Sequence, residues 1–240
     1  MFFIDAAMVG HLGAEASASI GIVESTTWLM GSMLSALSIG FSVQVAHFIG
    51  ANDFFKARQV FRHALICGLI FSLLMMTIGI AIHSRLPYWL GGGADIAGNS
   101  SAYFLIYSFA LPFVLLYFMS ASMLKSSGNM KIPSILSVVM CLLDVVFNYI
   151  FIYIFKLGVA GAALGTLLAY VVTVLPMVWQ STCKSKILAL HLDKIKFRWN
   201  WAYVRNAAKI SGPIALQAVL MSGAQVICTI IVAPLGNIAI

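Results

Sequence analysis

Asp144 lies near the middle of residues 132–155, an apolar run that is long enough to cross a bilayer. A carboxylate at that depth costs roughly 2.5–3.5 kcal/mol on membrane-insertion scales, so its presence there indicates a functional role. Asn148 follows one helical turn later and therefore faces the same side of a helix. Asp5 and Glu24 also lie in apolar segments, and no Lys or Arg accompanies these acids. The sequence thus predicts an acidic polar site inside a membrane.

The composition supports a membrane setting for these acids. Hydrophobic residues make up 62% of the 240 residues, and charged residues make up only 9%. An ordinary soluble domain is about 45–50% apolar and about 25% charged. The fold class that we expect is an all-α membrane protein, a polytopic helical bundle. The formal net charge of +7 comes from short basic clusters between apolar runs rather than from a basic groove lined by aromatic residues, so we expect no nucleic-acid partner.

The motif content argues against an enzyme. The four cysteines show no CxxC spacing, and the five histidines show no HExxH spacing. An intramembrane protease would need a GxSG, HExxH or GxGD pattern, and Asp144 lies in the sequence Leu-Leu-Asp-Val instead. We therefore expect neither catalytic activity nor a cofactor nor a dedicated metal centre.

Charge between the apolar segments predicts orientation. The segments that we expect to be helical cover residues 1–11 (a partial span), 17–48, 60–83, 101–124, 132–155, 157–182 and 206–234. Twelve of the fourteen basic residues flank the second, fourth and sixth connections, which leaves Arg85 and Lys156 for the other side. The positive-inside rule places those three connections in the cytoplasm. The prediction is a multi-pass protein of the cell's inner (plasma) membrane.

The polar residues agree in depth. At about 1.5 Å of rise per residue, Asp5, Glu24, Asn148, Asp144 and Thr166 all lie about 9–16 Å from the outer ends of their helices. They would share one band in the outer half of the bilayer. Depth does not fix the face of each helix, so convergence is a hypothesis at this point. A structural acid bonded to neighbours, with Asn148 and Thr166 as helix-packing contacts, is the plainer alternative.

A faint internal repeat suggests a duplication. Residues 4–13 resemble residues 227–236, and both copies end in Leu-Gly. The copies are six helices apart and run in the same direction, as in transporters with two parallel repeats. We therefore expect an N-terminal six-helix lobe at residues 1–183 with a truncated first helix, a cytoplasmic inter-lobe linker at 184–200, and the incomplete first helix of a C-terminal lobe at 201–240.

Several stretches together resemble the multidrug and toxic compound extrusion family of secondary transporters. The stretches that carry the resemblance are Phe3–Gly13, Val45–Arg58, Leu124–Pro133, Leu157–Thr166, and Gly212–Gln217 with Ala233–Gly236. His47 stands where Gln is more usual. The resemblance implies the first lobe, plus helix seven, of a twelve-helix pseudo-symmetric transporter with a central cleft.

The resemblance also implies a function and a site. It implies antiport that exports organic cations, including drugs, in exchange for H⁺ or Na⁺. Its first-lobe site would comprise Asp5, Asp144, Asn148 and Thr166, although the order of Asp and Asn on helix five departs from that of other members. Two carboxylates within about 4–6 Å would let one hold a proton near neutral pH. The same four groups could instead form an all-oxygen cage for Na⁺, and the sequence leaves both open.

Four further residues are candidates for the cargo cleft. Trp28 and Tyr107 could offer soft or cation–π surface to cationic amphiphilic small molecules, with Gln217 beside them, and Glu24 could face an outer vestibule. The alternative function is a flippase for lipid-linked saccharides of the same superfamily. Anionic cargo of that kind would need Arg or Lys in the cleft, and the apolar spans contain none at that depth. Half a cleft lacks its opposite wall, so we expect that the missing C-terminal lobe is needed for transport.

Overall fold

The computed structural model describes residues 2–185, 187–189 and 199–232, and this part of the chain is helical with short connections. The elements are α1 (Phe2–Gly10), α2 (Ala14–Gly50), α3 (Phe54–Ile82), α4 (Leu86–Trp89), α5 (Ala94–Ser126), α6 (Lys131–Tyr149), α7 (Gly158–Trp179) and α8 (Trp201–Val232). Wider π-helical turns extend α6 at Ile150–Ile154 and α7 at Gln180–Lys184. The repeated copy at residues 227–236 and the middle of the linker at 184–200 lie partly outside the described residues.

Residues with left-handed backbone angles end two of the long helices. Gly128 (φ 83°) follows α5, and the N–H groups of Gly128 and Asn129 donate to the carbonyls of Lys125 and Leu124. Asn52 (φ 58°) ends α2 with the same pair of bonds, to Ile49 and Phe48. Such bonds satisfy carbonyls that the helix leaves free, and Gly or Asn tolerates the backbone angle. These local signals produce the tight reversals between antiparallel neighbours.

Asp53 begins α3 at the reversal after α2. Its carboxylate accepts a hydrogen bond from the Lys56 backbone N–H at 3.1 Å and forms an ion pair with the Lys56 ammonium at 2.8 Å. Both contacts favour the charged carboxylate, so the Lys56 side chain and then its backbone N–H lower the pKa of Asp53. Asp53 is therefore an N-cap of the usual kind.

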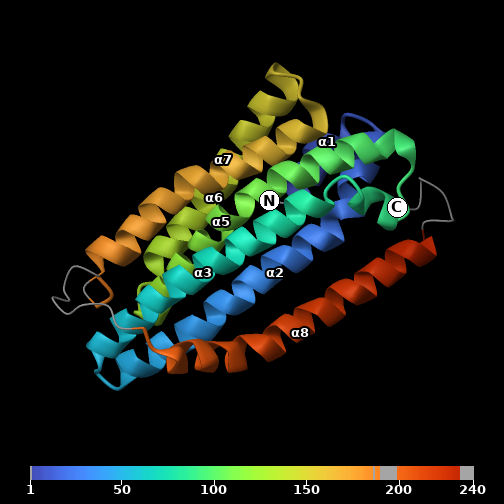
Figure 1. The fold of residues 1–240 in the computed structure, drawn as a ribbon. Coiled ribbons are helices and arrows are strands. Elements are labelled where there is room, and N and C mark those ends of the chain that lie inside the picture. Colours follow the sequence, from blue (N-terminus) through green and yellow to red (C-terminus); the bar gives the residue numbers. More distant parts are fainter. Residues whose placement is uncertain (1, 186, 190–198, 233–240) are drawn as a thin grey trace.

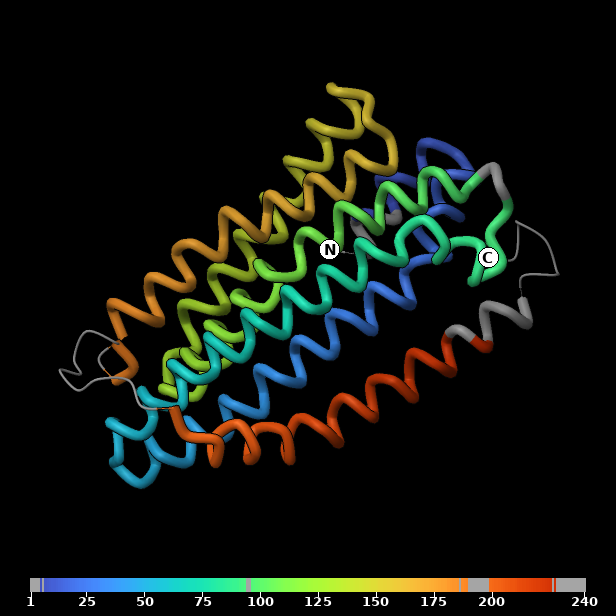
Figure 2. The backbone as a smooth tube through the Cα atoms, viewed as in Figure 1, coloured from blue at the N-terminus to red at the C-terminus, as the bar shows by residue number. Residues whose placement is uncertain are grey.

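Helices α1, α2, α3, α5, α6 and α7 form a six-helix bundle, and α5 packs at its centre against α2, α3 and α7 (Figures 1 and 2). The buried core runs along this centre and includes Leu34, Phe41, Phe104 and Leu115. α8 follows α2 along one side of the bundle and also contacts α3. In Figure 1 the two helices lie together near the start of α8 and separate toward its end.

Five of the described helical stretches are long and apolar enough to cross a membrane: Ala14–Gly50, Phe54–Ile82, Ile96–Ser126, Lys131–Ile154 and Gly158–Lys184. Their outer faces stay apolar where they leave the core, as at Ile70 on α3 and Leu142 on α6, which are 63% and 62% exposed. In water such a surface would aggregate. The bundle is therefore built for a lipid environment.

The bundle has two chemically different ends. The connections α2–α3, α5–α6 and α7–α8 meet at one end, which we call the basic end (Figure 1). Exposed cations flank these connections: Lys56, Lys125, Lys131, Lys184, Arg205 and Lys209. The other end, called the opposite end, carries the α1–α2, α3–α5 and α6–α7 connections, with Arg85 and Lys156.

Several helix bounds differ from those expected. α3 begins at Phe54 and α5 at Ala94, before the apolar runs at 60–83 and 101–124 that predicted them. Both early turns contain polar or small residues, which hydropathy does not assign to a span. The short helix α4 lies between the apolar runs at 60–83 and 101–124, where no helix was expected. Pro87 is compatible with a first helical turn, since that turn leaves its N–H groups unpaired.

Candidate functional site

A buried polar cluster joins α1, α6 and α7. Asp5 in α1 is 1% exposed, Asp144 and Asn148 in α6 are both fully buried, and Thr166 in α7 is 7% exposed. α1 contacts α2, α6 and α7, which brings Asp5 to the other three residues. We call Asp5, Asp144, Asn148 and Thr166 the acidic cluster. The structure brings these four together, out of the five polar residues that share one depth in the sequence.

Hydrogen bonds connect the acidic cluster. The Asn148 side-chain N–H donates to Asp5 Oδ1 at 2.5 Å. The Thr166 hydroxyl lies 3.1 Å from Asp144 Oδ1 and 3.4 Å from Asp5 Oδ2, so it bridges the two carboxyl groups. A threonine hydroxyl has one hydrogen to donate and lone pairs that accept. Serving two carboxyl oxygens well therefore requires that one carboxyl group carry a proton of its own, or that a cation share the oxygens.

Two oxygens of the acidic cluster lack a hydrogen-bond partner. Asp144 Oδ2 and Asn148 Oδ1 are both buried and unpaired. A buried polar atom without a partner costs about 1–3 kcal/mol. The acidic cluster offers carboxyl, amide and hydroxyl oxygens as acceptors, and its two acids give it negative charge. The acidic cluster is therefore suited to take up a small cation or a proton.

Gly165 leaves the space that the Asn148 side chain occupies. A Cβ at Gly165 would overlap Asn148 Oδ1 and fall 2.9 Å from the Asn148 backbone nitrogen. One turn earlier, a Cβ at Gly161 would fall 2.9 Å from the Phe151 carbonyl oxygen. The two glycines form a GxxxG pattern that lets α6 and α7 approach closely. Close approach of the helices is what brings Asn148 and Asp144 to Thr166.

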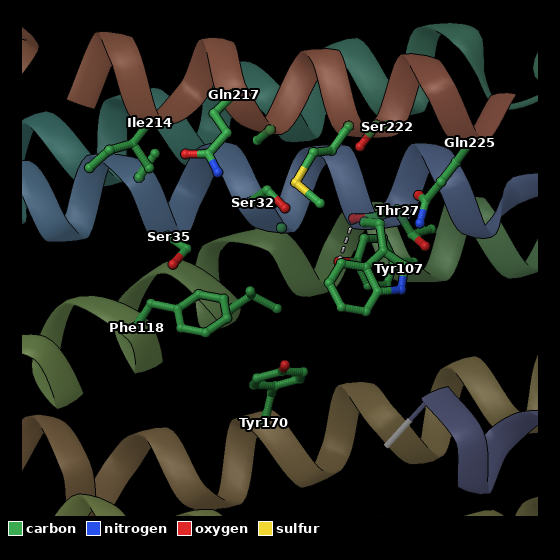
Figure 3. Close-up of a pocket in the computed structure, with 16 residues that line it drawn as sticks. Thr27, Ser32, Ser35, Tyr107, Phe118, Tyr170, Ile214, Gln217, Ser222 and Gln225 are labelled. Carbon is green, nitrogen blue, oxygen red and sulfur yellow. Dashed lines mark hydrogen bonds between the residues drawn. The ribbon is translucent and has the colours of Figure 1, made fainter. Parts of the chain in front are cut away.

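A separate cavity of about 480 Å³ lies between α8 and the bundle (Figure 3). Its wall combines aromatic rings, hydroxyls and two amides: Thr27, Trp28, Ser32, Ser35, Tyr107, Phe118, Tyr170, Gln217, Ser222 and Gln225 are among the lining residues. No charged side chain is among the described residues that line it. The Tyr107 hydroxyl donates to the Thr27 carbonyl at 3.1 Å, which ties α5 to α2 at the cavity wall.

Of the four residues expected in the cargo cleft, three line this cavity and one does not. Trp28, Tyr107 and Gln217 line the cavity, whereas Glu24 does not. Glu24 lies one turn nearer the start of α2 and is half-buried. Asp5 and Asp144 do not line the cavity either. The acidic cluster and the cavity are therefore two neighbouring places rather than one.

Tyr170 was missed by sequence reasoning and connects the two places. It lies one turn after Thr166 on α7, so both side chains leave the same face of that helix. Its ring lines the cavity and packs edge-on against Tyr117 at 5.7 Å between centroids. The signal in the sequence that could have identified Tyr170 was its four-residue spacing from Thr166. α7 therefore contributes Thr166 to the acidic cluster and Tyr170, one turn later, to the cavity wall.

Within the described residues, no group of three or more His, Cys, Asp or Glu side chains is placed to hold a metal ion. The four histidines whose surroundings are described are scattered over α2, α3 and the connections that adjoin them.

Fold and site define a polytopic helical membrane protein with an acidic cluster and a neutral cavity inside the lipid-spanning region. Residues 1–150 match the MatE family model, and the chain belongs to that family. It is 28% identical over 212 residues to the multidrug export protein MepA of Staphylococcus saprophyticus, and 24% identical to MepA of Staphylococcus aureus strain MRSA252. Each match covers 88% of this chain and 46% of the relative. The chain spans about half the length of the curated relatives it matches.

Solved structures show the same fold. An inward-facing and an outward-facing MATE family transporter of the MOP superfamily each superpose with a TM-score of 0.86 at 24% identity. The alignments cover 92% of this chain and 50% and 49% of those chains. A MOP superfamily transporter from Pyrococcus furiosus, described as having reverse polarity of its binding pocket, superposes with a TM-score of 0.85 at 24% identity over 93% of this chain and 49% of that one. The fold is the one expected.

Proposed function

We propose that this chain forms the N-terminal half of a secondary antiporter that exports amphiphilic organic cations in exchange for H⁺ or Na⁺. The acidic cluster would bind the coupling ion, and the cavity beside α8 would bind the cargo. Export of drugs is what the names of the MepA relatives state for those proteins. The observation that carries the ion-binding role is the meeting of two buried acids with two unpaired oxygens.

A proton or Na⁺ would complete the acidic cluster. If Asp5 or Asp144 carried a proton, that carboxyl group would donate to the Thr166 hydroxyl oxygen. The hydroxyl would then donate its own hydrogen to the other carboxyl group. Na⁺ would instead take the unpaired Asp144 Oδ2 and Asn148 Oδ1 among its ligands. Hard cations prefer such oxygen ligands. Either ion would remove the cost of holding negative charge in a dry interior.

The cavity favours a cationic amphiphile over an anionic one. Its aromatic rings, which include Trp28, Tyr107 and Tyr170, offer apolar area and π faces to an organic cation. The Gln217 and Gln225 side chains add amide oxygens. A lipid-linked saccharide with an anionic headgroup would need cations in the wall, and the described lining has none. The flippase alternative is therefore not favoured.

Coupling would run through α7 rather than through direct charge attraction. The acids lie outside the cavity wall, so a bound ion would not contact the cargo. α7 contributes Thr166 to the acidic cluster and Tyr170 to the cavity, and a shift of this one helix would be felt at both. The ion and the cargo drive exchange only if they favour different positions of the helices.

The rest of the transporter would supply the opposite wall. We propose residues 1–183 as one lobe, 184–200 as the connection between lobes, and 201–240 as the beginning of a second lobe. The basic end would face the cytoplasm of a cell whose plasma membrane holds the protein, because cations accumulate on that side. Cargo would enter from the basic end and leave at the opposite end.

The test is efflux of a cationic dye by the complete transporter with Asp5→Asn and, separately, Asp144→Asn. Each change keeps the side-chain volume but removes a charge and a proton site. We expect efflux to fall at least about tenfold in each variant, because the loss of ion binding removes the driving force. Imposed pH and Na⁺ gradients would identify the coupling ion.

Asp53→Asn is the matched control, since Asp53 is an acid at the basic end outside the cluster. It should leave efflux unchanged. Wild-type efflux in both Asp5→Asn and Asp144→Asn, with normal protein levels, would refute the coupling role.

A further inference from the structure

His63 in α3 lies at the junction between the bundle and the start of α8. Its side chain is fully buried. Nδ1 lies 2.7 Å from the Gln59 carbonyl, and Nε2 accepts a hydrogen bond from the Asn200 backbone N–H at 2.9 Å. Because Nε2 accepts, the ring hydrogen must reside on Nδ1, which donates to Gln59. The neutral imidazole is thus oriented by its own helix toward α8.

The residues that His63 contacts begin α8. The Asn200 side-chain oxygen accepts from the Ala202 N–H at 2.9 Å, which makes Asn200 the N-cap of this helix. The imidazole also packs against Trp199 at 5.0 Å and against Tyr203 at 5.3 Å between ring centroids. The first turn of α8 is therefore fastened to α3 by a directional bond and by aromatic contacts.

α2 fastens the same part of α8 from another direction. The Gln44 amide donates to the Tyr203 carbonyl at 3.0 Å. One turn earlier on α2, a Cβ at Gly40 would overlap Ser211 Oγ and fall 2.7 Å from the Ala207 carbonyl oxygen. The two helices approach closely there, and farther from the basic end the cavity lies between them.

We propose that His63 is a positioning residue that latches the first turn of α8 to the bundle and so holds α8 against α2 on the basic-end side of the cavity. The accepting Nε2 atom is the working part of this His63 latch. An N-cap carries the backbone direction of its helix, so a bond to Asn200 fixes where α8 starts and how it leaves the bundle. Release of the latch would let α8 swing away at the basic end.

The experiment measures the position of α8 in the chain itself, in lipid nanodiscs, and needs no transport. Spin labels at Ile70 on α3 and Leu216 on α8, two exposed positions, report the separation in a background without native cysteines. His63→Phe keeps an aromatic ring but removes the acceptor. His63→Gln keeps an acceptor near the Nε2 position but removes the ring.

We expect His63→Phe to broaden the 70–216 distance distribution and to raise the population of long distances about fivefold, the effect of losing one net hydrogen bond. His63→Gln should stay close to wild type. Asn200→Pro removes the donating N–H and should reproduce the broad distribution of His63→Phe. Asn200→Ala removes the cap oxygen but keeps the N–H, so its distribution should stay close to wild type.

A second label pair distinguishes release from misfolding. Labels at Ile70 and Val146 lie within the bundle, on α3 and α6, and their distance should not change in any variant. A narrow 70–216 distribution in His63→Phe, or broadening in His63→Gln alone, would overturn the proposal. Because no efflux is measured, failure of the antiport proposal would leave this result standing, and the reverse also holds.

Discussion

Thr166 is the shared hydrogen-bond partner of two buried acids, and its hydroxyl is the group in the described acidic cluster that reaches both. A hydroxyl can turn its hydrogen toward either carboxyl group, and a methyl group in its place cannot. The balance of charge and protons between Asp5 and Asp144 thus depends on a single oxygen atom of α7.

Thr166→Val tests that dependence because valine has almost the same shape. We expect a loss of roughly 1–3 kcal/mol in unfolding free energy, since both carboxyl groups lose a partner in a buried site. SDS-induced unfolding of the chain would measure it. Thr77→Val on α3 is the control, because its exposed hydroxyl bonds to the Leu74 carbonyl of its own helix. Equal effects of the two changes would contradict the bridging role.

Gly165 has an equally specific role at this scale. In Gly165→Ala the new methyl group would overlap Asn148 Oδ1. We expect destabilisation of about 1–3 kcal/mol from overpacking, together with loss of ion-dependent stabilisation as Asn148 moves off Asp5. Thermal unfolding with and without Na⁺, at two pH values, would show both.

Gly98→Ala on α5 is the matched control, because nothing lies within 4 Å of its added methyl group. Helix propensity alone should make that change neutral or stabilising by up to about 1 kcal/mol. A Gly165→Ala protein as stable as Gly98→Ala would show that the close approach of α6 and α7 is not needed.

At the scale of elements, α2 and α8 cross in close approach at Gly40, which has no side chain. Gly40→Ala would place a methyl group against Ser211 and the Ala207 carbonyl. We expect α8 to move outward while the bundle keeps its structure, since Gly40 lies on the α8 side of α2. Labels at 70 and 216 should report a longer mean distance, and labels at 70 and 146 an unchanged one.

Gly21→Ala serves as the control for that change, because it lies on α2 with open space around it. If both glycine variants give wild-type distances, the crossing is looser than the structure indicates.

Helices were easier to predict from the sequence than the faces they turn to one another. Long apolar runs with turn residues between them are a strong signal, and the six helices of the bundle and α8 occur where those runs lie. Position along the membrane normal follows from residue counting, so the sequence alone groups Asp5, Asp144, Asn148 and Thr166 at one depth. Rotation about each helix axis depends on packing between residues far apart in sequence. Glu24 shares that depth and still lies outside both the acidic cluster and the cavity wall.

His63 shows the same limit from the other side. A histidine in an apolar helix has no distinctive neighbours in sequence, and its partner Asn200 is 137 residues away. Gly165 was hidden as well, because a glycine in a small-residue helix signals close packing without naming the side chain that packs on it. The acids could be found from their cost in lipid, whereas the residues that position them could not.

At the scale of the whole molecule, charge divides the two ends. Cys183 is exposed at the basic end, and the neighbouring Lys184 ammonium lies over the Trp179 ring at 4.3 Å. If the basic end is cytoplasmic, a membrane-impermeant maleimide should label Cys183 in inverted vesicles and not in intact cells. The background for this test carries alanine at the other three cysteines.

Leu157→Cys with Cys183→Ser gives the reciprocal test at the opposite end, where Leu157 is exposed. It should be labelled in intact cells. Labelling of Cys183 from outside would invert the orientation and, with it, the direction proposed for cargo.

The one-sided attachment of α8 has a mechanical consequence. From Ser211, where it touches α2, to Val232 the helix extends about 30 Å at 1.5 Å per residue. A rigid rod of that length turning by about 10° about its contact point carries its far tip through about 5 Å. A small turn of α8 beside Gly40 is thereby magnified into a displacement of its far tip as wide as a small organic molecule.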